Sequence, residues 1–161
     1  MIKVGDRLPE ATLTLAGGEG PRPVSASELT AGKTVALFAV PGAYTPTCSA
    51  KHLPSFVQHA EALKAAGVDV IACTSVNDPF VMAAWGKEQG VGDKVLMLAD
   101  GNAAFAKALG LELDASGFGM GTRSRRYSML VRDGLVEQLN VEEGGGYEVS
   151  SAERLLEQLK A

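Results

Sequence analysis

Cysteine and histidine are scarce in this sequence of 161 residues. Its two cysteines are Cys48 and Cys73, and its two histidines are His52 and His59. Two cysteines are too few for a disulfide framework, and these two form neither a CxxC pair nor a set with the spacing of zinc ligands. We therefore expect no structural or catalytic metal.

Long apolar runs and concentrated positive charge are missing as well. No segment reaches the ~18 apolar residues that a membrane-spanning helix needs, and residues 1–6 lack the apolar core of a signal peptide. The formal net charge is -4, and apart from the short cluster at 123–126 the basic residues are dispersed. Because nucleic acids and anionic membranes attract concentrated positive charge, neither is an expected partner. We expect a cytoplasmic protein.

The composition is that of a globular protein. Apolar residues make up 46% and charged residues 21%, without an internal repeat, a linker or a low-complexity tract. A chain of this length buries roughly two thirds of its unfolded surface. We therefore expect a single domain over residues 1–161.

The pattern of apolar residues predicts an α/β fold. The runs at 34–40, 68–76 and 95–99 are typical of parallel strands covered on both faces, and a segment of helical character follows each one. Alternation at 11–15 and the turn-rich residues 17–21 predict a β-hairpin extension at the amino end.

The last third of the chain predicts an antiparallel pair backed by a helix. Strand patterns at 126–132 and 135–141 flank a two-residue turn, and Ser150 with Glu153 predicts a capping box for the final helix. The stretch 110–122 has no clear period and is expected to be a loop. Three βα units followed by such a pair form a thioredoxin-like fold, with a central mixed sheet flanked by helices.

Cys48 lies where an α/β sheet places its chemistry. It follows the strand at 34–40 and opens a long helix expected to end near Gly67. A helix N-terminus offers free N–H groups and a positive dipole end, which favour a thiolate. An ordinary thiol, with a pKa of ~8.5, is only about 3% ionised at pH 7, so a nearby cation is also expected. Cys48 is therefore the first candidate nucleophile, although a lone cysteine is more often a small buried apolar residue.

The neighbours of Cys48 favour chemistry over packing. Pro41 and Pro46 stiffen the preceding loop, and neither contributes an N–H. Thr45 lies three residues before Cys48, where its hydroxyl reaches either the sulfur or a bound substrate oxygen. Prolines and hydroxyls around a cysteine are an unusual way to fill a core position.

The run Pro41-xxx-Thr45-xx-Cys48 matches PxxxTxxC, the signature of the peroxiredoxins. The wider likeness resembles the type 5 subfamily, also called type II, and covers most of the chain. The segments that carry it are residues 4–6, 40–49, 52–54, 75–81 and 126–129.

The resemblance implies a thiol peroxidase that reduces hydrogen peroxide and alkyl hydroperoxides. The Cys48 thiolate would attack a peroxide oxygen, leaving a sulfenic acid and water or an alcohol. The family's supporting residues match Pro41, Thr45 and Arg126. The Arg126 guanidinium would stabilise the thiolate and hold the peroxide oxygens.

Two questions stay open around that cation. Spacing alone does not exclude Arg123 or Arg125 in place of Arg126. His52, one turn beyond Cys48, would favour the thiolate if it were charged, but a histidine in such a place is more often a hydrogen-bonded structural residue.

Cys73 has two interpretations of about equal weight. The apolar run around it fits a buried strand cysteine. In plant and some bacterial relatives, however, the cysteine at this position resolves the sulfenic acid, and the topology brings the end of its strand towards Cys48. Pro54 would weaken the first helical turn and allow it to unwind, so that the two sulfurs can meet.

The resemblance also implies a homodimer that takes electrons from thioredoxin, glutaredoxin or glutathione. Two rival functions are a thiol-disulfide oxidoreductase, disfavoured because CxxC is absent, and a redox-sensing binding or holdase protein with Cys48 as the sensor. Residues 117–121 miss the GxGxxG pattern, so no dinucleotide site is expected. A peroxidase that works through its own thiol also needs no organic cofactor, and none is expected. Phe118 and Met120 offer an apolar wall to alkyl hydroperoxides instead.

Overall fold

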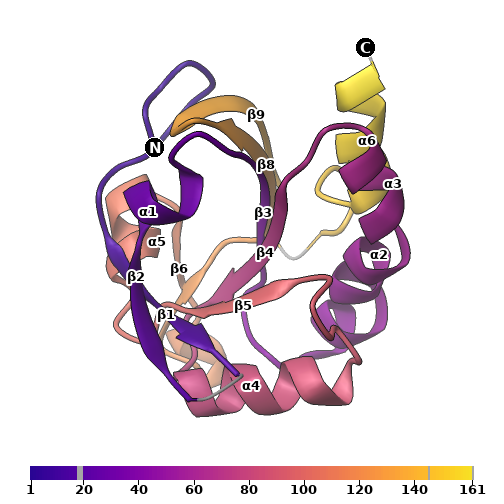
Figure 1. Ribbon diagram of the computed structural model, residues 1–161. Coiled ribbons are helices and arrows are strands. Elements are labelled where there is room, and N and C mark those ends of the chain that lie inside the picture. The colour runs from indigo at the N-terminus through magenta and orange to yellow at the C-terminus, as the bar shows by residue number, and fades with distance from the viewer. Residues whose placement is uncertain (18–19, 145, 161) are drawn as a thin grey trace.

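The computed structural model describes residues 1–17, 20–144 and 146–160 (Figure 1). Its framework is a mixed sheet of seven strands, parallel in the middle and antiparallel on both sides. From one edge to the other the strands are β2 (Arg22–Ser25), β1 (Thr12–Ala16), β5 (Leu96–Ala99), β4 (Val70–Ser75), β3 (Thr34–Ala39), β8 (Tyr127–Arg132) and β9 (Leu135–Val141). This is the predicted sheet of a thioredoxin-like fold.

Helices cover both faces of the sheet. One face packs against α1 (Ala26–Thr30) and α5 (Ala104–Leu109). The opposite face is covered by α2 (Leu53–Gln58), α3 (Ala60–Ala65), α4 (Pro79–Glu88) and α6 (Ala152–Lys160). Because all six residues of β3 are buried, this strand lies at the centre of the molecule. No helix within the described residues has the length and apolar character to cross a membrane.

The predicted amino-terminal hairpin is present, but it is not an appendage. Strand β1 pairs with β2 and also with β5, with Leu15 opposite Leu98. The side chain of Leu13 is buried beneath α1 and α5 with the rest of that face. The hairpin therefore extends the main sheet on the β5 side.

The prediction of a loop over 110–122 is wrong in part. Strand β6 (Glu112–Asp114) pairs with β7 (Thr122–Ser124), and the single 3-10 turn η2 (Ser116–Phe118) lies between them. Strands of three residues are too short to display an alternating pattern in the sequence. Gly119 and Gly121 have φ values of 73° and 66°, so glycine permits the chain to turn back here.

The long helix predicted after Cys48 is divided into three pieces. The chain first forms a π-helical turn, η1 (Cys48–His52), in which the N–H of Leu53 donates to the carbonyl of Cys48, five residues back. Helix α2 then begins, with Pro54 in its first turn, where a missing N–H is tolerated. The discontinuity expected from Pro54 is therefore in the wide turn that starts at Cys48.

The N-cap residue predicted for the last helix is wrong. The hydroxyl of Ser151, not of Ser150, accepts a hydrogen bond from the N–H of Arg154 at 3.2 Å. The hydroxyl of Ser150 instead donates to Glu142. A capping pattern in the sequence cannot reveal that a distant carboxylate engages the first serine.

Candidate active site

The loop between β3 and η1 closes tightly before Cys48. A Cβ at Gly42 would lie only 3.2 Å from Thr45 Cγ2 and 3.3 Å from Met120 Cε, so glycine permits this approach. Pro41 follows directly after the last residue paired with β4, Val40, whose N–H donates to the carbonyl of Thr74. Because proline has no N–H, the ladder ends there.

Thr45 and Cys48 meet as their spacing predicts. The Thr45 hydroxyl lies 2.7 Å from Cys48 Sγ and 2.7 Å from the carbonyl oxygen of Gly42. A hydroxyl has one proton, so it can donate to only one of these acceptors at a time. Donation to sulfur is favoured when Cys48 is a thiolate, because hydrogen bonds to ionised acceptors are the stronger ones.

Arg126 reaches the same sulfur from the other side. It lies just before β8, is 6% exposed, and its Nη2 donates to Cys48 Sγ at 3.2 Å. The two rival arginines point elsewhere: Arg123 donates to the carbonyls of Met120 and Val76, and Arg125 to that of Glu142. Of the three, Arg126 alone contacts the thiol, and within the described residues it forms no salt bridge with a carboxylate.

His52 is buried and neutral. Burial and, next, the charge of Arg126 lower its pKa to about 3. Its Nε2 lies 2.9 Å from the carbonyl of Ser150, which can only accept, so the proton resides on Nε2. The unprotonated Nδ1 then accepts from Arg126 Nη1 at 2.9 Å. His52 thus contacts the arginine and not the thiol.

Cys73 occupies the middle of the sheet. In β4 it pairs with Phe38 of β3 and Met97 of β5, and its side chain is fully buried in the same apolar cluster as that of Cys48. Burial, followed by the charge of Cys48, raises the pKa of the Cys73 thiol. Both cysteines are free thiols.

No pattern in the sequence predicts several contacts of the site. The carbonyl of Ser150 holds His52, and Trp85 of α4 donates its indole N–H to the hydroxyl of Ser49 in η1 at 3.0 Å. The amide oxygen of Asn77 accepts the N–H of Ala43, which joins the loop after β4 to the loop before Cys48. The run at 75–81 that carries the family resemblance was the one available signal for Asn77.

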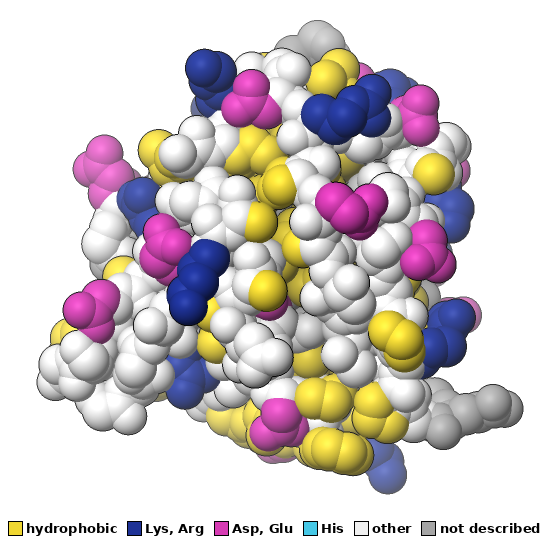
Figure 2. All heavy atoms as spheres, turned by 90° about the vertical axis from the view of Figure 1, so that its left-hand side faces the viewer, with side chains coloured by type: hydrophobic (Ala, Val, Ile, Leu, Met, Phe, Trp, Pro, Cys, Tyr) yellow, Lys and Arg dark blue, Asp and Glu magenta, His cyan; other side chains and the backbone are white. Residues whose placement is uncertain are grey.

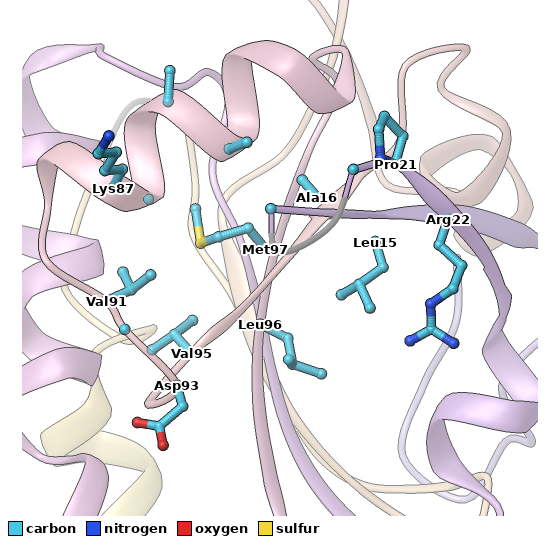
Figure 3. A pocket seen from close by; sticks show the side chains of 16 residues that line it. Leu15, Ala16, Pro21, Arg22, Lys87, Val91, Asp93, Val95, Leu96 and Met97 are labelled. Carbon is cyan, nitrogen blue, oxygen red and sulfur yellow. The ribbon is translucent and has the colours of Figure 1, made fainter.

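A cavity of about 1100 Å³ lies away from this site, between the β1–β2 hairpin, α4 and β5 (Figure 3). Leu15, Val95 and Met97 contribute apolar side chains to it, and Arg22 and Lys87 contribute charges from different walls. None of the predicted site residues lines it.

The surface over α1 and α5 carries basic and acidic side chains that are interspersed, and hydrophobic side chains gather along its lower edge (Figure 2). Within the described residues, no three His, Cys, Asp or Glu side chains gather as ligands for a metal ion.

Comparison with known proteins identifies the family of this chain. The family model described as Redoxin matches residues 3–156. Peroxiredoxin-2E-2, chloroplastic, from Oryza sativa subsp. japonica is 56% identical over 98% of this chain and 72% of its own length. Peroxiredoxin-2B from Arabidopsis thaliana is 49% identical over 98% of each chain. The chain belongs to the type 5, or type II, peroxiredoxins.

Solved structures agree with this family and fold. The crystal structure of reduced Prx3 from Vibrio vulnificus, in complex with H2O2, is 55% identical over 99% of each chain, with a TM-score of 0.95. That of peroxiredoxin 5 from Alvinella pompejana is 35% identical over 99% of each chain, with a TM-score of 0.87. The predicted family, fold and thiol peroxidase activity are thereby confirmed.

The low pKa of His52 makes the stability of this peroxiredoxin depend on pH. Once unfolded, His52 takes up a proton below its ordinary pKa of 6.5, whereas the folded protein does so only near 3. Stability should therefore be complete above about pH 6.5 and fall as the pH decreases towards 3. We expect the free energy of unfolding, measured with urea, to be about 2 kcal/mol lower at pH 5 than at pH 8.

The matched variants are His52→Gln and His59→Gln. Only the first should flatten this pH dependence, because His59→Gln leaves the buried ring in place. An equal slope in wild type and His52→Gln would show that another group causes it.

Proposed function

We propose that Cys48 is the peroxidatic nucleophile of this peroxidase, with Thr45, Arg126 and Pro41 as its supporting residues. The observation that carries the proposal is the convergence of two donors, the Thr45 hydroxyl and Arg126 Nη2, on one buried sulfur. The thiolate attacks one peroxide oxygen, and the O–O bond breaks. The sulfur becomes a sulfenic acid, and the leaving oxygen takes up a proton as water or an alcohol.

Arg126 acts on the charge that moves during this step. Its guanidinium lies against the sulfur and stabilises the thiolate before reaction. As the S–O bond forms, negative charge develops on the leaving oxygen, and the same fixed cation stabilises it in a site from which water is excluded. Pro41 supports the loop and presents no N–H that would compete for the oxygens.

Turnover with peroxide tests these roles. Cys48→Ser should abolish repeated consumption of hydrogen peroxide, whereas Cys73→Ser retains the first oxidation. Arg126→Gln should lower the second-order rate constant with peroxide by about 10²–10³-fold, since it removes a donor to the reacting atoms. Arg154→Gln, at an exposed arginine of α6, serves as the control and should keep the rate.

Thioredoxin, glutaredoxin and glutathione should each be supplied in turn, because each is a proposed electron donor. Undiminished turnover in Cys48→Ser would show that Cys48 is not the nucleophile. A single slow oxidation with every reductant would favour the sensor function instead.

The cytoplasmic location stays a prediction.

We further propose that Cys73 resolves the sulfenic acid after η1 unwinds. The thiol attacks the sulfenic sulfur, water leaves, and a disulfide forms. Burial of Cys73 in the middle of β4 argues that this requires movement, and the wide turn η1, with Pro54 just after it, is the element that can open. In the alternative, Cys73 is structural and an external thiol reacts with Cys48 directly.

Intact mass spectrometry after one equivalent of peroxide separates these routes. If Cys73 resolves Cys48, wild type loses the mass of two hydrogen atoms, and Cys73→Ser gains that of one oxygen. A gain of one oxygen in both proteins would show that Cys48 reacts without Cys73, by a one-cysteine mechanism.

We propose that the enzyme is a homodimer formed at the edge of the sheet where Cys48 lies. Three aromatic side chains are exposed there, Tyr44, Phe80 and Phe118, with 48%, 71% and 86% of their surfaces in solvent. The loop of Tyr44 contacts the loop before α4 through Ala43 to Asn77, and β7, which follows η2, contacts the same loop through Arg123 to Val76. Exposed apolar groups collected in this way are typical of an interface between protein chains.

Analytical ultracentrifugation tests the dimer. Phe80→Glu should shift the protein towards the monomer, because it buries a charge in the interface. Val4→Glu, another exposed apolar position, is the control and should keep the state of wild type. A monomeric wild-type protein at micromolar concentration would reject the proposal.

A further inference from the structure

Glu142, the residue after β9, is a carboxylate with only 3% of its surface exposed. Its Oε2 accepts the N–H groups of Val149 and Ser150, both at 2.8 Å, and the hydroxyl of Ser150 at 2.6 Å. The N–H of Glu148 lies 2.9 Å from each of its oxygens. Four donors from the segment 148–150 thus converge on one side chain.

That segment and Tyr147, the residue before it, reach the reaction centre through three contacts. The carbonyl of Ser150 accepts the Nε2 proton of His52 at 2.9 Å. The ring of Tyr147 lies 5.2 Å from that of His52, and the guanidinium carbon of Arg126 lies 5.9 Å from the centre of the Tyr147 ring. Displacement of the segment would therefore disturb both His52 and Arg126.

The backbone ties the carboxylate to the same arginine. The N–H of Glu142 donates to the carbonyl of Arg126 at 2.9 Å, and Arg125 Nη2 donates to the carbonyl of Glu142 at 3.2 Å. Glu142 therefore lies beside Arg126, at the point where β8 begins and the antiparallel strand β9 ends.

We propose that Glu142 is a positioning residue for Arg126 and, through it, for the Cys48 sulfur. This inference rests on the proposed role of Arg126. Glu142 accepts the N–H and hydroxyl of Ser150 and so fixes the position of that residue. The Ser150 carbonyl fixes the orientation of the His52 ring, and the ring fixes one arm of the guanidinium. The other arm is then directed at the sulfur.

The tautomer of His52 explains why the Ser150 carbonyl matters. Only a ring with its proton on Nε2 presents a lone pair at Nδ1 to Arg126. If the carbonyl moved away, the proton could transfer to Nδ1 and oppose the N–H of the guanidinium. Two donors facing each other would turn Arg126 away from Cys48.

Glu142 is suited to this task because it stays ionised. Burial by itself would raise its pKa, but the Ser150 hydroxyl and the N–H groups of the 148–150 segment together lower it. Among the described residues, the titratable and charged groups that face this region are His52 from η1, Arg125 and Arg126 before β8, Tyr147, and Glu153 of α6. A carboxylate that accepts so many donors also needs no further partner.

The experiment measures the pH at which Cys48 becomes reactive towards iodoacetamide, in a Cys73→Ser background so that one thiol reports. Glu142→Ala should move this midpoint upwards, as Arg126→Gln also should, and lower the rate with hydrogen peroxide at pH 7 by at least about tenfold. In the double variant, Glu142→Ala should add nothing to Arg126→Gln, because the two act in series.

Controls separate positioning from loss of structure. Glu143→Ala removes the adjacent, exposed carboxylate and should leave the midpoint and the rate unchanged. Nitrogen chemical shifts of His52 should report the Nε2 proton in wild type and its partial loss in Glu142→Ala. If Glu142→Ala does not fold, Glu142→Gln, which keeps one acceptor oxygen, should shift both quantities in the same direction by less.

Each outcome decides something. If Arg126→Gln leaves the midpoint and the rate unchanged, the proposed role of Arg126 fails. If Arg126→Gln changes them and neither substitution of Glu142 does, the positioning role alone is overturned. Additive effects in the double variant would also overturn it, because they would mean that Glu142 acts by another route.

Discussion

A buried guanidinium that pairs with no carboxylate among the described residues is the constraint around which the site is organised. Arg126 is 6% exposed, and its polar contacts are the sulfur of Cys48 and a neutral imidazole. An isolated buried charge is costly, because it has lost water and gained no counter-charge. The group best placed to supply that counter-charge is the Cys48 thiolate. The cation and a thiolate at Cys48, in contact at 3.2 Å, therefore stabilise each other.

The low pKa of His52 follows from the same constraint. A charged imidazole beside Arg126 would place two cations together in the interior, so the ring stays neutral and serves as an acceptor. This excludes the charged His52 considered from the sequence. Its function is to hold the arginine, and the Ser150 carbonyl holds the ring in the tautomer that permits this.

The sequence predicted what depends on local pattern. The central strands, the hairpin of β8 and β9, and the meeting of Thr45 with Cys48 follow from apolar runs, turn residues and one-turn spacing. Contacts between residues that are far apart in the sequence could not be predicted from local pattern. His52 and Arg126 are 74 positions apart, and His52 and Ser150 are 98, so only tertiary packing brings them together. Arg126 itself was found through family resemblance, because spacing did not distinguish it from Arg123 or Arg125.

The single proton of Thr45 has a mechanical consequence. While Cys48 is a thiol, the Thr45 hydroxyl is free to donate to the Gly42 carbonyl and fasten the loop. When it turns to the thiolate, that carbonyl keeps only the backbone N–H of Thr45, at 3.4 Å. A hydrogen bond of this kind contributes about 1 kcal/mol. Ionisation thus loosens the chain that leads into η1, so the protein is readiest to rearrange in the state in which its sulfur is readiest to react.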